Sequence, residues 1–553
     1  MKKKIFLGLT LLLAGSVTLF QVSCKKKPFD DLLIGVNTDV LSAPTLIVFE
    51  NAKSGATNQP ENFTLTISGK DKDKVLSCIA STTFKVQNGF ISLNLAKGVV
   101  PTQANPITFT INGTAAGFEP LKQDIIITSN EEQRFNVKMI EIGNLPDGIV
   151  EVKQALALTS GAFTAPTTIE TTPGNSTDKS VKMTFDAGTT MTDENGTKLV
   201  GTEVQTKIRY YDPQTEAVNV FPGGLNPQNV VDEQGKTIEN GVQFYSAGLI
   251  TVNMTVGSKV VKNFSKPVAT EIKINNNQTN FTTGKQTVAG DKIPLWSCNE
   301  QTGQWKKEGE ATVFDVNGEL VAKFEVQHLS YWNLDHYRSG LSASQLDIVF
   351  DADWSAPSGY YTTTLYSSTG DYIGSSYIGS LANGTINTMT QTPNLDGAYI
   401  EVNNWLSNKS VKSDPFNPST KGKIHVNVSS LNEDDLVNIS LKYTVKCTKN
   451  KIKPNAGTWI VVTDVESNLK QVFRTPKITS QNTDGLMTFK LRKGRKYRVQ
   501  TTGLDGNIIS YESVLDVNNL KYTNPKGFTV NKFIYNSITE TIEADVVYVT
   551  TKC

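Results

Sequence analysis

The chain has 553 residues, and 54 lysines and arginines face 53 aspartates and glutamates, which gives a formal net charge of +1. At about 100–200 residues per domain, this length predicts three to five domains. A near-neutral balance without a basic stripe excludes a typical nucleic-acid binder, which needs clustered cations to displace counterions from phosphates.

The first 23 residues have the three-part pattern of a secretory signal peptide. Lys2, Lys3 and Lys4 precede an apolar run over 5–20, and small residues then lead to Cys24. This pattern predicts that residues 1–23 are removed and that the mature chain begins at Cys24. We expect Cys24 to carry a diacylglycerol and an N-acyl chain, which together exceed the two lipid signals needed for stable anchoring. We therefore expect the N-terminal end of the mature chain to be anchored in a membrane by these lipid chains, without a membrane-spanning segment.

The segment Gln21-Val22-Ser23-Cys24 resembles the lipobox of bacterial lipoproteins, with Gln21 in place of the usual leucine. Lys25 and the pair Asp30-Asp31 resemble the charged sorting signals of surface lipoproteins in the Bacteroidota. The resemblance implies an outer-membrane lipoprotein of the cell envelope, displayed on the cell surface. The alternative is an ordinary cleaved signal peptide followed by an incidental cysteine. Residues 24–35 then form a polar tether.

Apolar and polar residues alternate with a period of two through the rest of the chain. Phe63, Leu65 and Ile67 show this rhythm, and the segments 91–95 and 424–428 repeat it. Such alternation buries one face of a strand, and Asn-Gly and Asp-Gly turns separate the runs. The sequence predicts an all-β chain with several Ig-like or transthyretin-like β-sandwich domains in series.

Turn and linker signals divide the mature chain into four units. An Ig-like β-sandwich is expected over 36–140, closed by the turn at 144–148, and a β-rich unit over 141–338. A serine- and glycine-containing linker at 339–344 precedes a sandwich with aromatic-rich strands over 345–436. The last sandwich is expected over 437–553.

Three tryptophan-containing motifs mark the second unit. They are Ile293-Pro294-Leu295-Trp296, Glu300-Gln301-Thr302-Gly303-Gln304-Trp305 and His328-Leu329-Ser330-Tyr331-Trp332. These segments resemble a β-rich domain of Bacteroidota surface lipoproteins and, more distantly, the extracellular domain of cartilage intermediate layer protein. The resemblance implies no catalysis. The three tryptophans are then interpreted as packing centres, because a buried indole supplies a large apolar area.

The last unit is similar to the carboxypeptidase-regulatory-like, transthyretin-like sandwich. Its landmarks are the strand Trp459–Asp464, the turns Asp484-Gly485 and Lys493-Gly494, and the strand that holds Tyr497. The segment Tyr443–Cys447 replaces the glycine-rich opening strand of that family. The resemblance implies a fold and no peptidase activity.

The five cysteines are scattered, at Cys24, Cys78, Cys298, Cys447 and Cys553. With Cys24 acylated, the remaining four are too few and too far apart for a disulfide scaffold. Cys447 and Cys553 lie in the same unit. The sequence is compatible with a disulfide between them and with two free thiols.

Residues with the chemistry of an active site are sparse. His328 and His336 lie near Asp335, and imidazole and carboxylate are the usual groups for acid/base work or metal binding. No third ligand follows at a recognised spacing, and no nucleophile motif is present. We therefore predict no catalytic residues, no metal and no cofactor. The alternative is a cell-surface hydrolase with its site near His328 and Asp335.

Aromatic side chains are concentrated at the start of the third unit, among glycines, serines and threonines. The candidate ligand-binding residues are Trp354, Tyr360, Tyr366 and Tyr372. Even spacing places Tyr360 and Tyr366 on one strand face and Tyr361 on the other. Exposed aromatics beside hydroxyls form a recognition surface for a glycan or an extracellular protein. Alternatively, the tyrosines only cap a thin core.

These patterns together favour a non-catalytic, lipid-anchored cell-envelope protein. The expected role is that of an adhesive, glycan-binding or structural interaction module.

Overall fold

The structure, a computed structural model, describes most of the chain from residue 41 to residue 550. The segments left out within this range are 78–80, 103–104, 131–132, 222–223, 226, 228, 240, 300–301, 340–344, 353–360, 379–380, 382, 391, 393–394, 405–408, 432–435, 448–458, 467–469, 475–485, 503–507, 517 and 521–527. Cys24, Trp354 and Tyr360 lie outside the described residues, as does Cys553. The backbone of Cys447 is described, but its side chain is not, so the question of a disulfide stays open.

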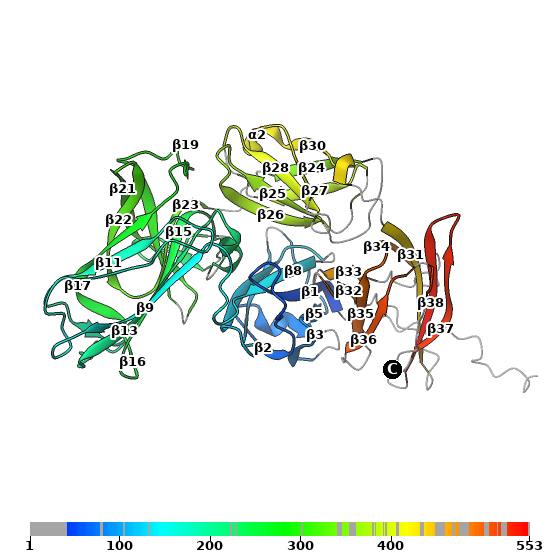
Figure 1. Cartoon of the computed structure of the whole chain (residues 1–553), viewed down its shortest axis with the longest axis horizontal. Helices are drawn as coiled ribbons and strands as arrows, with labels where there is room; N and C mark the ends of the chain where they lie inside the picture. Colours follow the sequence, from blue (N-terminus) through cyan, green and yellow to red (C-terminus); the bar gives the residue numbers. More distant parts are fainter. Residues whose placement is uncertain are drawn as a thin grey trace, which may run out of the picture.

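The described chain is almost entirely β-structure, as the alternation predicted (Figure 1). Its α-helical content within these residues is the single turn α2 (Pro418–Lys421). None of the described helices has the length and apolar character to cross a bilayer. The prediction of an all-β chain with sandwiches in series is confirmed.

The first sandwich packs two four-stranded sheets, ordered β3-β5-β1-β8 and β4-β2-β6-β7. Its strands are β1 (Leu41–Asn51), β2 (Phe63–Ser68), β3 (Val75–Ser77), β4 (Phe84–Val86), β5 (Phe90–Ala96), β6 (Ile107–Gly113), β7 (Leu121–Ile127) and β8 (Gln133–Met139). Inward residues such as Phe49, Leu93 and Phe109 fill the core between the sheets. Strand β8 forms one edge of its sheet, and its outward face is therefore open to a neighbouring unit.

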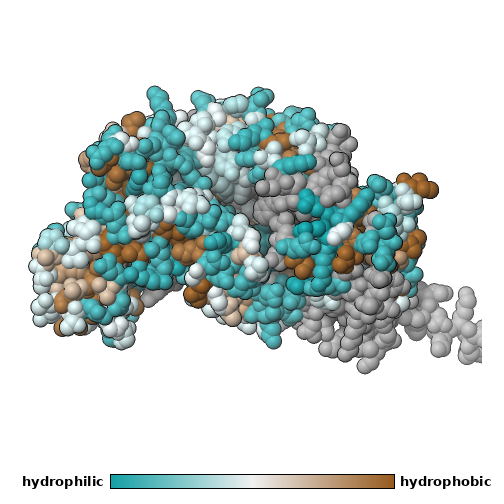
Figure 2. Space-filling model, viewed as in Figure 1, coloured by the Kyte–Doolittle hydropathy of each residue, from teal (hydrophilic) through white to brown (hydrophobic). Residues whose placement is uncertain are grey.

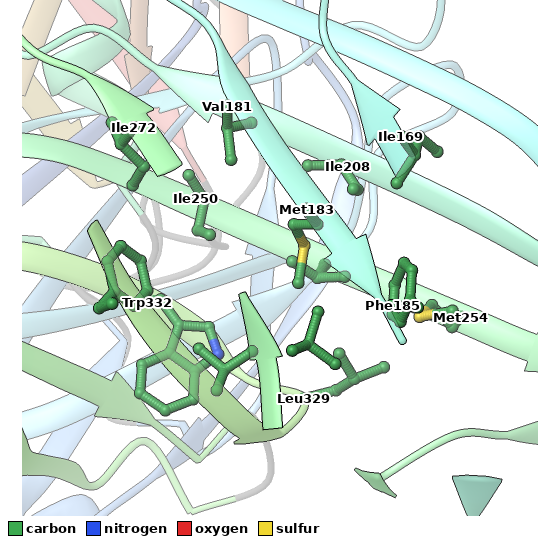
Figure 3. Close-up of a cluster of buried hydrophobic side chains, with 14 of the residues drawn as sticks. Ile169, Val181, Met183, Phe185, Ile208, Ile250, Met254, Ile272, Leu329 and Trp332 are labelled. Carbon is green, nitrogen blue, oxygen red and sulfur yellow. The ribbon is translucent and has the colours of Figure 1, made fainter. Parts of the chain in front are cut away.

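The second unit consists of one long sheet curled around a large apolar core and of a separate two-stranded sheet. Its main path runs β10-β11-β17-β22-β21-β20-β23-β15-β13-β9, and the end strands β9 and β10 lie near each other. The strands are β9 (Ile149–Ala157), β10 (Thr167–Glu170), β11 (Val181–Phe185), β12 (Met191–Thr192), β13 (Glu203–Tyr211), β14 (Val230–Val231), β15 (Val242–Val256), β16 (Lys259–Val260), β17 (Asn263–Lys273), β18 (Thr279–Asn280), β19 (Lys285–Gln286), β20 (Lys292–Cys298), β21 (Trp305–Val316), β22 (Glu319–His328) and β23 (Tyr331–Ser339). Met183, Phe185, Ile250 and Trp332 point into this core (Figure 3).

All three tryptophans of the second unit are buried. Trp296 and Trp305 have no exposed surface and Trp332 is 2% exposed. The indole N–H of Trp296 donates to the carbonyl oxygen of Asp335 at 3.1 Å. Phe244 packs between Trp296 and Trp305, with ring centroids 5.1 and 5.2 Å away. These contacts give the tryptophans the packing role that the sequence indicated.

The third and fourth units are two-sheet sandwiches. In the third, sheet β27-β24-β30 faces sheet β26-β25-β28-β29, and in the fourth, sheet β34-β31-β38-β37 faces sheet β33-β32-β35-β36. The third contains β24 (Gln345–Asp351), β25 (Tyr361–Tyr366), β26 (Tyr372–Ile378), β27 (Ile386–Thr390), β28 (Tyr399–Asn404), β29 (Lys409–Lys412) and β30 (Lys423–Asn427). The fourth contains β31 (Leu436–Cys447), β32 (Trp459–Asp464), β33 (Lys470–Arg474), β34 (Leu486–Arg492), β35 (Lys496–Thr502), β36 (Ile508–Val514), β37 (Phe528–Asn536) and β38 (Thr541–Thr550).

The three sandwiches share one connectivity. In each, the first strand pairs in parallel with the last: β1 with β8, β24 with β30, and β31 with β38. The second sheet also has the same order each time, β4-β2-β6-β7, β26-β25-β28-β29 and β33-β32-β35-β36. The chain therefore contains a repeat of architecture, interrupted by the curled second unit.

The units pack side by side, with the third above the first in Figure 1 and flanked by the second and fourth. Phe90 of the first sandwich and Trp459 of the fourth share one buried apolar cluster. Arg209 of the second unit pairs bidentately with Glu119 of the first, at 2.6 and 2.7 Å. These contacts bring surfaces from distant parts of the sequence together around a common cleft.

Candidate functional site

A cleft of about 820 Å³ lies where the first, second and third units meet. Ligand pockets typically measure about 300–1,000 Å³, so this volume suits a small molecule or a few sugar rings. We call it the tyrosine cleft. Its walls come from β8 of the first sandwich, from the segment 213–219 of the second unit, and from the sheet of β25, β26 and β28 in the third. Figure 1 shows that sheet on the side of the third sandwich nearest β8.

Strand β25 supplies the wall of the third sandwich because its side chains alternate between the core and the cleft. Tyr361, Thr363 and Leu365 are 2%, 0% and 1% exposed, respectively. Thr364 and Tyr366, on the opposite face, line the cleft. Two of the four candidate ligand-binding residues, Tyr366 and Tyr372, therefore lie on one wall.

Three tyrosines form a row across neighbouring strands, because Tyr366 is in register with Tyr372 on one side and Tyr399 on the other. We call these three residues the tyrosine row. The rings of Tyr366 and Tyr399 stack with centroids 5.4 Å apart and planes inclined by 25°. Tyr372 meets Tyr366 edge-on at 6.4 Å and 81°. Tyr366 and Tyr372 line the cleft, whereas Tyr399 supports Tyr366 by stacking and carries the Lys412 ammonium 4.7 Å from its own ring centroid.

The hydroxyls of this wall remain hydrogen-bond donors at neutral pH. Burial, together with the nearby Glu401 carboxylate, raises the pKa of Tyr366 to about 12. Burial also raises the pKa of Tyr372, whose hydroxyl lies 2.9 Å from the Ser375 hydroxyl. Neutral phenols beside Thr364 and Ser375 can donate and accept, as recognition of a polyhydroxylated ligand requires.

The opposite wall is the outward face of β8. Arg134, Asn136 and Lys138 line the cleft, while Val137 and Met139 point into the core of the first sandwich. The Arg134 side chain donates from Nε to Asn136 Oδ1 at 2.9 Å, which orients the guanidinium. Lys138 pairs with Glu50 at 2.8 Å.

The segment 213–219 closes the cleft from the second unit and ties it to the first. Glu216, at the start of η2 (Glu216–Val220), accepts hydrogen bonds from the backbone N–H of Ser54 at 3.2 Å and of Asp147 at 3.0 Å. The Ser54 hydroxyl also donates to Glu216, at 2.5 Å. This carboxylate therefore has a structural role.

Asp371 fixes the third sandwich onto the second unit. This carboxylate is 3% exposed and accepts from the backbone N–H and hydroxyl of Thr279, from the side-chain amide of Gln214, and from Ser367 and Thr369. A buried carboxylate is tolerated when its oxygens are fully hydrogen-bonded, as here. We call these hydrogen bonds of Asp371 with Thr279 and Gln214 the latch. The latch holds the tyrosine-bearing wall in place relative to the other two walls of the cleft.

The structure does not bring His328 and Asp335 into one site. The His328 ring packs against Trp332, with centroids 4.8 Å apart, and is about one-third exposed. Asp335 is completely buried. Since three positions separate Trp332 from Asp335 along β23, their side chains point to opposite faces of the sheet. The grouping of His328 with Asp335 suggested by their spacing is wrong.

His328 instead joins a cluster around Glu308. Its Nε2 lies 3.4 Å from Glu308 Oε1, and the Ser297 hydroxyl donates to the same oxygen at 2.8 Å. In a Ser-His-Asp triad the imidazole accepts the proton of the serine hydroxyl, whereas the Ser297 hydroxyl donates to a carboxylate. Burial opposes ionisation of Glu308, but hydrogen bonds from His328, Ser297 and Lys306 lower its pKa to about 2. The arrangement is that of an ion-paired surface cluster.

The other two groups singled out in this region are enclosed. His336 is 2% exposed, and its Nδ1 lies 3.0 Å from the Thr282 hydroxyl. Burial lowers the pKa of His336 to about 4 and raises the pKa of Asp335 well above its usual range. Within the described residues, no group of three or more His, Cys, Asp or Glu side chains could hold a metal ion.

Sequence reasoning missed the walls supplied by β8 and by the segment 213–219, and it missed Tyr399. The cross-strand position of Tyr399 follows from the register of β28, which no local signal specifies. Trp354 and Tyr360 fall in 353–360, outside the described residues.

No family model matches this chain. Solved structures that are similar to it include the major pilin subunit BcpA of Bacillus cereus, at 10% identity over 92% of this chain and 99% of that chain, with a TM-score of 0.12. The Bacillus anthracis TIE protein matches at 10% identity over 96% of this chain and 77% of that chain, with a TM-score of 0.13. The full-length major pilin SpaD of Corynebacterium diphtheriae matches at 10% identity over 92% and 97%, with a TM-score of 0.12. Similarity at this level carries no argument about function.

Proposed function

We propose that the protein is a non-catalytic lipoprotein of the bacterial outer membrane, held at the cell surface through Cys24, that binds a glycan in the tyrosine cleft. The lipobox-like segment before Cys24 supports the anchor. The cleft supports the binding role, and the second and fourth units act as scaffold. That assignment agrees with their resemblance to the cartilage intermediate layer protein domain and to the carboxypeptidase-regulatory-like sandwich.

The placement of Tyr366 and Tyr372 of the tyrosine row on the cleft wall is the observation that carries this proposal. A sugar ring has an apolar face of C–H groups and an edge of hydroxyls, so it fits a site with aromatic faces and nearby donors and acceptors. Tyr366 lines the cleft together with Thr362, Thr364, Ser375 and Asn403. The face of the molecule in Figure 2 is hydrophilic over much of its area. A soluble polar ligand is the natural occupant of such a site.

A hydrolase centred on His328 and Asp335 is the alternative function. It lacks geometric support because His328 and Asp335 lie on opposite faces of the sheet, and because the Ser297 hydroxyl is bound to Glu308. The described residues around His328 therefore do not form the proposed acid/base pair, whereas cleft-lining residues such as Tyr366 and Arg134 enclose a binding cleft.

The test is binding of the detergent-solubilised full chain to a glycan array, in parallel with a broad hydrolase screen. We expect saccharide binding that is weakened by Tyr366→Ala and retained in Phe314→Ala, a matched aromatic variant 46% exposed at a distant surface of the second unit. Turnover in the hydrolase screen, abolished by His328→Ala, would overturn the proposal.

A further inference from the structure

The tyrosine cleft carries an excess of positive charge. Arg134 and Lys138 line one wall and Lys409 lines another, whereas Glu216 is the one carboxylate among the described residues that line it. Glu216 is engaged by Ser54 and by the Asp147 backbone, so it faces its own structural partners. Lys409 is exposed at the start of β29.

Lys470 adds a further positive charge behind the β8 wall, near Lys138 and Arg134. Glu50, which is 9% exposed, lies in the field of Lys138, Lys470 and Arg134. The Lys470 ammonium is 8% exposed and reaches the Phe49 carbonyl oxygen at 3.2 Å. The field of these three cations is offset in part by Glu50 and, at Lys470, also by Glu61. Partial burial strengthens that field, since charges are screened less away from bulk water.

We propose that the ligand of the tyrosine cleft is an anionic saccharide, whose carboxylate or sulfate group binds at the β8 wall beside Arg134 and Lys138 while a sugar ring lies against Tyr366. This inference rests on the proposed glycan-binding function and names the class of glycan. The Arg134 guanidinium is held by its Nε bond to Asn136 and its Nη2 bond to the Lys470 carbonyl oxygen, and it brings a fixed positive charge to this wall. Charge-assisted hydrogen bonds to a carboxylate or sulfate are the strong ones. Lys409 supplies a second cation across the cleft.

Matched pairs of saccharides that differ only in charge test this inference. The carboxylate arm compares oligogalacturonate with its methyl ester, and the sulfate arm compares a κ-carrageenan oligosaccharide with its desulfated form. The detergent-solubilised full chain should bind at least one charged member about tenfold or more tightly than its neutral partner at low salt. The difference should shrink at about 1 M salt, where the Debye length falls to about 3 Å. The preferred arm identifies the anion.

Charge-changing variants supply the matched control. Arg134→Gln and Lys409→Gln should each reduce the preference for the charged saccharide, whereas Lys259→Gln, at an exposed position of the second unit, should leave it unchanged. Arg134→Lys keeps the charge and should retain part of the preference, which separates loss of charge from loss of fold. Equal binding of charged and neutral partners would overturn this inference and leave the glycan-binding function intact. Absence of binding to any saccharide would overturn both.

Discussion

The Asp371 carboxylate of the third sandwich accepts two hydrogen bonds from Thr279 of the second unit, from the backbone N–H at 3.0 Å and from the hydroxyl at 2.5 Å. Because the tyrosine cleft is bounded by three units, this latch between two of them sets the position of its aromatic wall.

Replacing Asp371 by alanine should loosen the third sandwich from the second unit. The change leaves the buried Thr279 and Gln214 donors without their acceptor, at a cost of about 1–3 kcal/mol for each unsatisfied group. Faster hydrogen exchange at 278–281 and a lower melting temperature are the expected results. Asp193→Ala, which removes a turn carboxylate bonded to the Asn195 and Thr197 backbone, is the control. Unchanged exchange at Thr279 in Asp371→Ala would rule out the latch.

The stability of the first sandwich should fall in acid because of Glu50. Burial disfavours its charge, but Lys138, Lys470 and Arg134 lower its pKa from 4.5 to about 2. A carboxylate with a lowered folded pKa contributes stability that is complete above pH 4.5 and is lost as the pH falls toward 2. This contribution amounts to about 3 kcal/mol.

Glu50→Gln should be destabilised at pH 7 and should lack this acid-dependent loss. Denaturant unfolding at pH 7 and pH 3 measures both effects, with Glu325→Gln at an exposed site as the control. Parallel stability curves for wild type and Glu50→Gln across this range would show that Glu50 is not responsible.

His328→Ala should lower stability without any change in metal content. The substitution removes the packing on Trp332 and one partner of Glu308, and we expect a loss of about 1–2 kcal/mol. His425, whose side chain is 61% exposed, provides the control variant His425→Ala. Calorimetry and elemental analysis are the measurements. Stoichiometric zinc or iron in the wild type that is lost in His328→Ala would revive the hydrolase alternative.

Cys24→Ala should release the protein from the membrane fraction, because the predicted acyl chains are the anchor proposed for it. Cell fractionation after a high-salt and carbonate wash is the measurement, and Cys298→Ser, which changes a buried thiol, should remain in the membrane. Retention of Cys24→Ala after the wash would argue against the lipoprotein assignment.

Local periodicity was sufficient for the fold class and for the direction of individual side chains. The alternation of apolar and polar residues separates Tyr361 from Tyr366, and in the structure Tyr361 is 2% exposed in the core while Tyr366 lines the cleft. In the same way, His425 between Ile424 and Val426 points to solvent. Side-chain direction in a strand depends only on the neighbouring backbone, so a single sequence contains it.

The cleft itself could not be predicted, because it is made by contacts between distant segments. Arg134 and Tyr366 share it although 232 positions separate them in the printed sequence. Conversely, His328 and Asp335 are close in sequence but lie on opposite faces of the sheet. Strand register and the packing of whole units decide both outcomes, and neither leaves a local pattern.

Glycan binding at the tyrosine cleft can be tested by calorimetry with the saccharide that binds best on the array, comparing Tyr366→Ala with the wild type and Phe314→Ala. Loss of an aromatic binding residue typically costs about 2–4 kcal/mol. We expect Tyr366→Ala to bind at least tenfold more weakly, with a melting temperature near that of the wild type, while Phe314→Ala binds normally. Wild-type affinity in Tyr366→Ala would contradict glycan binding at this cleft.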